Sequence, residues 1–226
     1  MNKKLLIVAA HPDDEILGCG ATVAQLVRDG FSAYALILGE GITSRDPKRN
    51  AEKRRNELKE LKIHMGNAHK RIGIRKSYVH DLPDNRFDTV AFLDIVKLIE
   101  DVKDEVKPAL IFTHYENDLN IDHRITYKAV LTAARPLASE VVKEIYCFEV
   151  LSSTEWSFQY PFAPDTFFDV KKTINNKLMA LKEYKTELRQ YPHPRSLEGV
   201  ELSAKYWGQR VGLHYAEAFK TVRRIR

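Results

Sequence analysis

The chain has 226 residues, of which 44% are hydrophobic and 30% are charged. This composition is typical of a globular protein and excludes collagen-like, coiled-coil and disordered chains. No apolar stretch approaches the roughly 18 residues that a membrane-spanning helix needs. We therefore expect a soluble chain that folds as one domain over residues 1–226.

The net charge of +5 is unevenly distributed. Residues 43–76 contain 12 Lys or Arg against 4 Asp or Glu, and residues 220–226 add 4 basic side chains. Such a segment is typical either of a solvated helix face or of a site that attracts an anionic, phosphorylated ligand. No DNA- or RNA-binding motif accompanies it, so we expect no nucleic-acid partner.

The start of the chain, MNKKLLIVAA, is apolar after two lysines, as in a signal peptide, but acidic residues follow from Asp13. We interpret it as a buried first strand. Cys19 and Cys147 lie far apart and form no paired motif. Two such cysteines are typical of core residues in a reducing compartment, so we expect a cytoplasmic protein.

Strand-like and helix-like segments then alternate. Apolar, β-branched runs predict strands over Lys4–Ala10, Ser32–Leu38, Ser77–Asp81, Ala109–Thr113, Glu144–Val150 and Thr166–Val170. Helical patterns occur at Glu15–Arg28, Asn50–Met65, Val90–Val106, His123–Arg135 and Val170–Leu188, and we expect loops at Ser152–Pro164 and Tyr191–Gly199. This alternation predicts an α/β fold: a mostly parallel sheet with helices on both faces, in a three-layer sandwich.

Two loops that follow predicted strands are rich in metal-type ligands. Residues 11–15 (HPDDE) follow the first strand, and residues 114–123 (HYENDLNIDH) follow the fourth. Helix capping explains some of the carboxylates, with Asp122 as the expected N-cap of the next helix, but it does not explain His11. An acidic turn would repel pyrophosphate, so a nucleotide-binding glycine loop fits poorly.

If the fourth strand lies beside the first, at the switch point of a doubly wound sheet, the two loops face each other. Two imidazoles and one carboxylate with an open position are the ligand set of a catalytic zinc site. Imidazole favours zinc over magnesium, which prefers oxygen ligands. The loops therefore predict a zinc site used for chemistry.

At these residues the sequence resembles the PIG-L or LmbE-like family of zinc-dependent N-deacetylases. Ala10–Glu15 matches the family's A-H-P-D-D-E block in full, and Asp122-His123 matches its later D-H pair. Supporting matches are Arg54-x-x-Glu57, Leu82-Pro83-Asp84 and Tyr215–Phe219. The resemblance implies a Rossmann-like fold, zinc as cofactor, and hydrolysis of the acetamido group of a small N-acetylated sugar or sugar conjugate.

Carried over residue by residue, the resemblance implies that His11, Asp14 and His123 bind zinc and that Asp13 is the general base. Such a base takes a proton from the attacking water and returns it to the departing nitrogen. Adjacent carboxylates would then have different tasks, because one must hold the metal while the other stays free.

The sequence departs from some family members at the oxyanion helpers. Those members carry a tyrosine and a histidine where this chain has Asp118 and Asn120. His193 and His114 are the candidates to replace them, although His193 could equally be a surface loop residue. Asn120 stays a candidate for substrate binding.

Two further residues are candidates on the substrate side. Arg54 shares a helix face with apolar residues, which points it toward the carboxyl-end crevice. It could form a salt bridge that joins the helix to a loop or, as the resemblance implies, bind a sugar hydroxyl or phosphate. Asp84 could be a turn residue, but its place matches a family carboxylate that binds sugar hydroxyls. Weaker candidates are Arg86, Trp156 and Tyr160.

The sequence thus predicts a zinc-dependent carbohydrate N-deacetylase. Three alternatives stay open: an amidase that removes a larger acyl group, a metal-dependent phosphoesterase, and a non-catalytic module that binds a sugar or nucleotide. A free Asp13 argues against the last, because binding alone needs no base. A homo-oligomer is also left open.

Overall fold

The computed structural model describes residues 3–226, with a seven-stranded sheet at its centre. The strands are β1 (Lys4–Ala9), β2 (Ser32–Gly39), β3 (Ile74–Leu82), β4 (Leu110–His114), β5 (Glu144–Phe148), β6 (Thr166–Asp169) and β7 (Ala216–Arg224). Their order is β3-β2-β1-β4-β5-β7-β6, and β7 runs antiparallel to both of its neighbours. The predicted mostly parallel sheet is confirmed.

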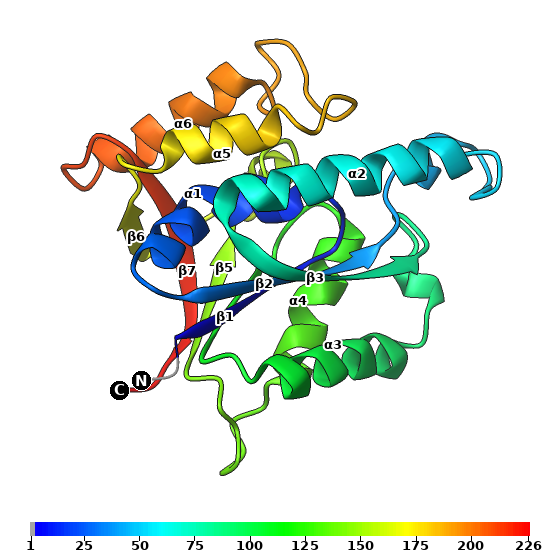
Figure 1. Ribbon diagram of the computed structural model, residues 1–226, viewed down its shortest axis with the longest axis horizontal. Coiled ribbons are helices and arrows are strands. Elements are labelled where there is room, and N and C mark those ends of the chain that lie inside the picture. Colours follow the sequence, from blue (N-terminus) through cyan, green and yellow to red (C-terminus); the bar gives the residue numbers. More distant parts are fainter. Residues whose placement is uncertain (1–2) are drawn as a thin grey trace.

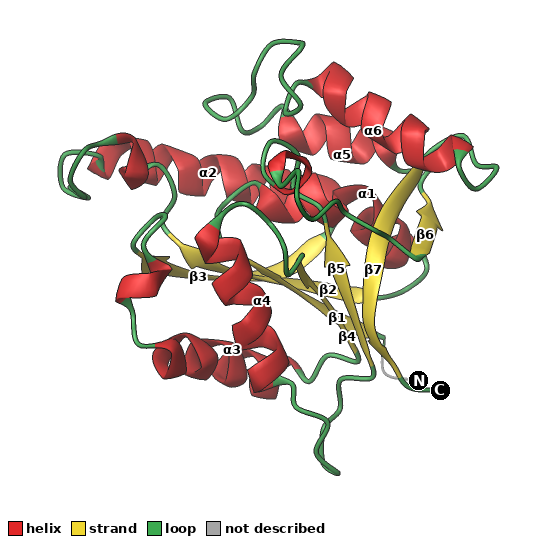
Figure 2. Ribbon diagram, turned by 180° about the vertical axis from the view of Figure 1, so that it is seen from behind, coloured by secondary structure: helices red, strands yellow, loops and turns green. Residues whose placement is uncertain are grey.

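Helices cover both faces of the sheet (Figure 1 and, from behind, Figure 2). One face carries α1 (Asp14–Arg28), α2 (Arg55–Ile72), α5 (Ile174–Leu181) and α6 (Leu197–Gln209), and the other carries α3 (Phe92–Val106) and α4 (Ile121–Ala133). Alternate residues of β1 enter two separate apolar cores: Leu5 and Ile7 on the first face, Leu6 and Val8 on the second. Burial on both faces explains why β1 is a continuous apolar run. The predicted three-layer α/β sandwich is confirmed.

The topology places the switch point where the sequence predicted it. β1 pairs parallel with β2 on one side and with β4 on the other. The chain winds outward from β1 to β3, then returns to β4 and winds the other way. The loops after β1 and β4 therefore leave the same edge of the sheet side by side.

A glycine allows α1 to lie close to the sheet. A Cβ atom at Gly18 would overlap the ring of Phe148 in β5, so a larger residue would collide with that ring. Because α1 begins at Asp14, this close approach lies about one helical turn after the HPDD segment.

Two elements were not predicted, α6 and β7. The expected loop at residues 191–199 ends at Ser196, whose hydroxyl caps α6 by accepting a hydrogen bond from the Gly199 N–H. α6 buries Val200, Ala204 and Gly208, a helical spacing that the sequence contains, and it covers β7. None of the helices within residues 3–226 is both long and apolar enough to span a bilayer.

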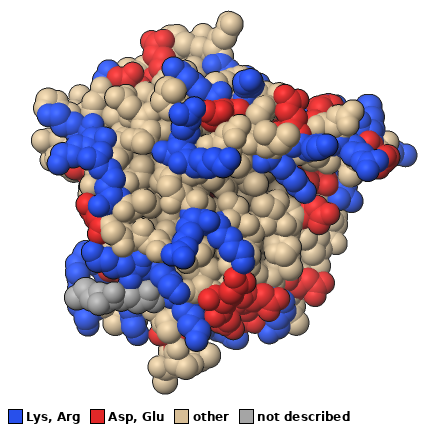
Figure 3. Space-filling view, in the orientation of Figure 1, with Lys and Arg blue, Asp and Glu red and all other residues tan. Residues whose placement is uncertain are grey.

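Several basic side chains of residues 43–76 form ion pairs. Arg49 pairs with Glu40, Lys53 and Arg54 with Asp46, and Arg71 with Glu183. Figure 3 shows Lys and Arg side chains scattered over this face with Asp and Glu among them. The solvated-face interpretation of this segment therefore accounts for much of its charge.

Candidate metal centre and active site

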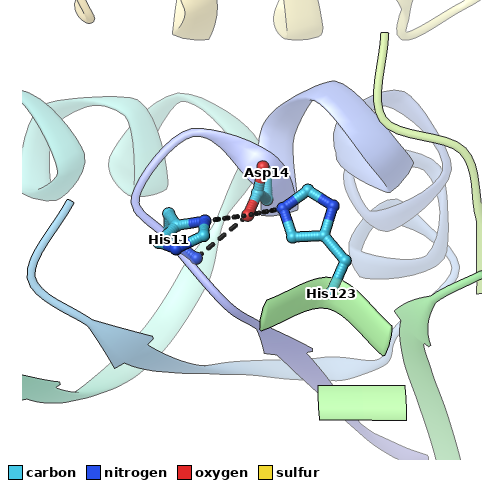
Figure 4. A group of neighbouring side chains, drawn as sticks. All are labelled: His11, Asp14 and His123. Atoms are coloured by element: carbon cyan, nitrogen blue, oxygen red, sulfur yellow. Dashed lines mark hydrogen bonds and ion pairs between the residues drawn. The ribbon is translucent and has the colours of Figure 1, made fainter. Parts of the chain in front are cut away.

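Three side chains from the two predicted loops meet at the switch point (Figure 4). His11 follows β1, Asp14 begins α1, and His123 lies in the first turn of α4. Their ligand atoms all lie within 4.8 Å of one another. Oδ2 of Asp14 lies 3.4 Å from Nδ1 of His11 and 3.2 Å from Nε2 of His123. The structure thus brings together the three residues predicted to bind zinc.

The polar atoms of this group fit a cation. His123 is 1% exposed, and its ring nitrogens face carboxylates, Asp14 at Nε2 and Asp118 at Nδ1, without hydrogen-bond geometry. Burial lowers the pKa of His123, but Asp14 and Asp118 outweigh it and raise the pKa to about 9. The site therefore favours positive charge, which a divalent ion can supply in place of a proton. Two imidazoles and a carboxylate are donors suited to zinc.

A carboxylate stands behind each imidazole. Oδ1 of Asp118 lies 3.1 Å from Nδ1 of His123, and Oδ2 of Asp122 lies 2.9 Å from Nε2 of His11. In both rings this is the nitrogen that does not face Asp14. Carboxylates in this position fix the orientation and tautomer of metal-binding histidines. Sequence reasoning missed this role for both residues.

The prediction that Asp122 caps α4 is wrong. Asn120 is the N-cap, and its side chain accepts a hydrogen bond from the Asp122 N–H over 2.8 Å. Asp122 lies inside the first turn, where its carboxylate accepts the backbone N–H groups of Asn85 and Phe87 as well as contacting His11. Asn is as good a cap as Asp, so the local sequence did not distinguish them.

A second group, His11 with Asp84 and Asp122, also lies close enough to hold a cation. These carboxylates are already satisfied, however. Asp122 accepts two backbone N–H groups, and Asp84 accepts the N–H of Ser44 and the amide of Asn85. The group of His11, Asp14 and His123 is therefore the better cation site, because its carboxylate oxygen lies between two imidazole nitrogens.

A cavity of about 130 Å³ opens beside the ligands, and we call it the switch-point cavity. It is lined by six residues predicted for the site: His11, Asp13, Asp14, Asp84, Asn120 and His123. Five polar residues that were not predicted also line it: Ser44, Arg45, Asn85, Glu187 and Arg195.

Asp13 precedes α1, but its carboxylate does not cap that helix. Its φ of 104° is unfavourable for a residue with a side chain, and its backbone N–H donates to Glu15 over 3.0 Å. Glu15 is in turn held by His69 and the Tyr184 hydroxyl. The Asp13 carboxylate makes no capping bond to α1, and the Asp13 side chain is 5% exposed. Burial raises its pKa, which favours a group that must hold a proton during turnover.

The two proposed oxyanion helpers do not line the switch-point cavity. His193 packs its ring against Trp156, with ring centroids 5.9 Å apart. His114 is fully buried behind the site, where it stacks on His123 at 3.9 Å and Nε2 accepts the Ala10 N–H. Burial lowers the pKa of His114, so it remains a neutral support for the neighbouring ring.

Arg54 also lies outside the cavity lining. Its guanidinium donates to Asp46 and to Glu57, each over 2.8 Å, and joins the loop after β2 to the start of α2. This is the salt-bridge alternative that the sequence left open. Arg45 lines the cavity instead and makes two hydrogen bonds of 2.7 Å to Glu187. Arg86, Trp156 and Tyr160 are likewise absent from the lining.

The match to known proteins agrees with this geometry. A family model described as PIG-L, GlcNAc-PI de-N-acetylase, matches residues 6–134, a span that contains all three ligand candidates and Asp13. The chain belongs to the PIG-L family. The predicted resemblance is thereby confirmed, and with it the assignment to a family of deacetylating enzymes.

Sequence similarity to relatives named as deacetylases extends over most of the chain. This chain is 30% identical to the "Uncharacterized deacetylase YaiS" of Escherichia coli over 81% of its own length and 91% of that protein. It is 25% identical to the "Probable N-acetyl-alpha-D-glucosaminyl L-malate deacetylase 2" of Bacillus cereus, over 83% of this chain and 84% of the relative.

Solved structures share the fold. N,N'-diacetylchitobiose deacetylase from Pyrococcus horikoshii aligns with a TM-score of 0.77 and 17% identity, covering 98% of this chain and 84% of that one. The 4-carboxy-2-hydroxymuconate hydratase GalB from Pseudomonas putida aligns with a TM-score of 0.76 and 21% identity, covering 99% and 98%. Because a hydratase shares this fold, the fold alone does not identify the reaction, and the residues of the site must do so.

Proposed function

We propose that this PIG-L protein hydrolyses the acetamido group of an N-acetylated sugar or sugar conjugate, with zinc as its cofactor. One observation carries the proposal. The switch-point cavity contains both a cation-binding set of two imidazoles and a carboxylate, and a separate buried carboxylate, Asp13. Similarity to sequence relatives named as deacetylases supports the same reaction.

His11, Asp14 and His123 would hold the ion. Zinc bound there would acidify a water molecule and polarise the acetamido carbonyl. Asp13 takes the proton of the attacking water and returns it to the nitrogen, which would otherwise leave as an unstable anion. The neighbouring carboxylates differ in task because Asp14 lies between two imidazoles, whereas Oδ1 of Asp13 makes no hydrogen bond within residues 3–226.

The size and polarity of the cavity support a small acyl group on a sugar. Its volume of about 130 Å³ is well below that of pockets that enclose whole drug-sized ligands, roughly 300–1,000 Å³. An acetamido group therefore enters while the sugar ring stays at the mouth. Ser44, Asp84 and Asn120 line the cavity and offer hydrogen-bonding groups to sugar hydroxyls. An amidase for larger acyl groups is favoured less.

Acetate release tests this proposal across many sugars at once. Zinc-loaded protein is incubated with a panel of N-acetylated monosaccharides, disaccharides, nucleotide sugars and glycosides, beside matched N-butanoyl compounds. We expect acetate from at least one acetylated compound, loss of that activity after chelation, and recovery with added zinc. Release from butanoyl compounds alone would support the amidase, and no release from any compound would contradict the proposal.

A further inference from the structure

Arg195 connects the switch-point cavity to the loop before α6. Its Nη1 donates to Oδ2 of Asp13 over 3.0 Å, and the arginine side chain is 23% exposed. This pair joins residues 182 positions apart in the sequence. One oxygen of the Asp13 carboxylate is thus engaged, while Oδ1 has no hydrogen-bond partner in the described chain.

Arg195 is itself held in place. Its Nε donates to the Ser152 hydroxyl over 2.7 Å and to the Leu151 carbonyl over 3.2 Å. With both Nε and Nη1 engaged, the plane of the guanidinium is fixed relative to the cavity. An arginine tied on one side to a loop backbone is a rigid support for the carboxylate on its other side.

The same loop also supports the metal side of the cavity. The hydroxyls of Ser153 and Thr154 donate to Asp118, the carboxylate behind His123. Residues 151–154 therefore hold the partner of Asp13 and the partner of a ligand candidate at once. Movement of this loop would displace both halves of the site together.

We propose that Arg195 is a positioning residue for Asp13: by engaging Oδ2, it leaves Oδ1 directed to the proton of the attacking water. This inference rests on the proposed role of Asp13 as general base. A carboxylate otherwise turns freely about its Cβ–Cγ bond, and a small misplacement of a reacting group costs rate. Arg195 lines the cavity and contacts Asp13, whereas His193, two residues earlier and predicted as an oxyanion helper, does not line it.

A double-mutant cycle tests the proposal on the substrate found by the acetate panel. Arg195→Gln should lower kcat roughly 10–100-fold, the usual effect of removing a supporting residue, with little change in KM. In the Asp13→Asn background the same substitution should add no further loss, because the group it positions is gone. Additive losses, or a loss confined to KM, would mean that Arg195 contacts substrate, and would overturn the proposal.

Two further variants test whether a lower kcat in Arg195→Gln merely reflects a damaged structure. Arg195→Lys keeps one charged donor and should recover part of kcat, since Lys lacks the second donor that binds the loop. Arg210→Gln removes an exposed arginine at the end of α6, outside the cavity lining, whose guanidinium donates to the Tyr206 hydroxyl, and it should leave kcat unchanged. If Arg195→Lys recovers none of the lost kcat, although its melting temperature and zinc content match wild type, the positioning role is contradicted.

A structural readout separates this inference from the proposed function. Crystal structures of zinc-loaded wild type and Arg195→Gln should show the Asp13 carboxylate turned or in two orientations in the variant, with His11, Asp14 and His123 unmoved. If the Asp13 carboxylate keeps its wild-type orientation in Arg195→Gln, the inference is overturned. Failure of the acetate panel would overturn the proposed function, while this comparison would still decide whether Arg195 positions Asp13.

Discussion

Oδ1 of Asp118 lies 3.1 Å from Nδ1 of His123, on the side of the ring away from Asp14. The carboxylate holds the imidazole in the orientation that presents Nε2 to the cation site. Asp118→Asn keeps the shape but removes the charge, so we expect zinc affinity to fall about 10–100-fold. Competition with a chelator of known affinity measures the change.

The control for Asp118 is Asp165→Asn, which removes a partly exposed carboxylate that pairs with Lys220 away from the cavity. This variant should bind zinc like wild type. If Asp118→Asn also keeps wild-type affinity, the carboxylate does not orient the ligand.

Removing a ligand should empty the site. His11→Ala and Asp14→Ala each delete one of three donors, so we expect zinc content to fall from about one ion per chain to near zero in dialysed protein. Elemental analysis provides the measurement. His193→Ala deletes an imidazole outside the cavity lining and should retain the ion. Full zinc content in both ligand variants would place the metal elsewhere.

Asp13→Asn should separate metal binding from turnover. The amide cannot accept the proton from water, so kcat should fall about 10²–10⁴-fold. Zinc content should stay near one ion per chain, because Asp14 is the carboxylate that faces both imidazoles. Steady-state acetate release and elemental analysis on the same preparation test both statements, and full activity would eliminate Asp13 as the base.

Arg45 and Arg54 should respond differently to removal. Arg45 lines the cavity, so Arg45→Ala should raise KM roughly tenfold, the size expected from one lost hydrogen bond to a charged group. Arg54 is engaged with Asp46 and Glu57 outside the cavity lining, so Arg54→Ala should leave KM unchanged. If Arg54→Ala raised KM and Arg45→Ala did not, Arg54 would be the residue that contacts the substrate.

Glu149 should make the protein less stable as pH rises. Burial raises the pKa of this carboxyl to about 7, although Trp207 and Ser203 donate to it. The folded protein then binds a proton that the unfolded chain releases near pH 4.3, so the free energy of unfolding falls between these pH values.

Glu149→Gln removes this dependence while keeping a hydrogen-bond acceptor. We expect it to raise the free energy of unfolding at pH 8 by about 1–3 kcal/mol relative to wild type, and to have little effect at pH 4. Denaturant titrations of metal-free wild type and variant at both pH values give the difference. An equal effect at the two pH values would rule out titration of Glu149 as the cause.

Local sequence predicted six of the seven strands and the contents of two loops. β1 and β4 are buried on both faces, so their apolar runs are distinctive, and loops after parallel strands must gather at one edge. The HPDDE segment follows β1 directly, and the DH pair opens the helix that follows the loop after β4. The meeting of His11, Asp14 and His123 therefore needed only the strand order.

The partners of these residues were decided by tertiary structure. Arg195 and Asp13 are 182 positions apart, and Arg195 lies in an irregular loop with no periodicity to indicate its direction. Arg45 and Arg54 belong to one basic segment with similar composition, and only the fold shows which of them lines the cavity. A strand's neighbours follow from burial and connectivity, whereas a loop side chain's partner depends on how separate segments pack together.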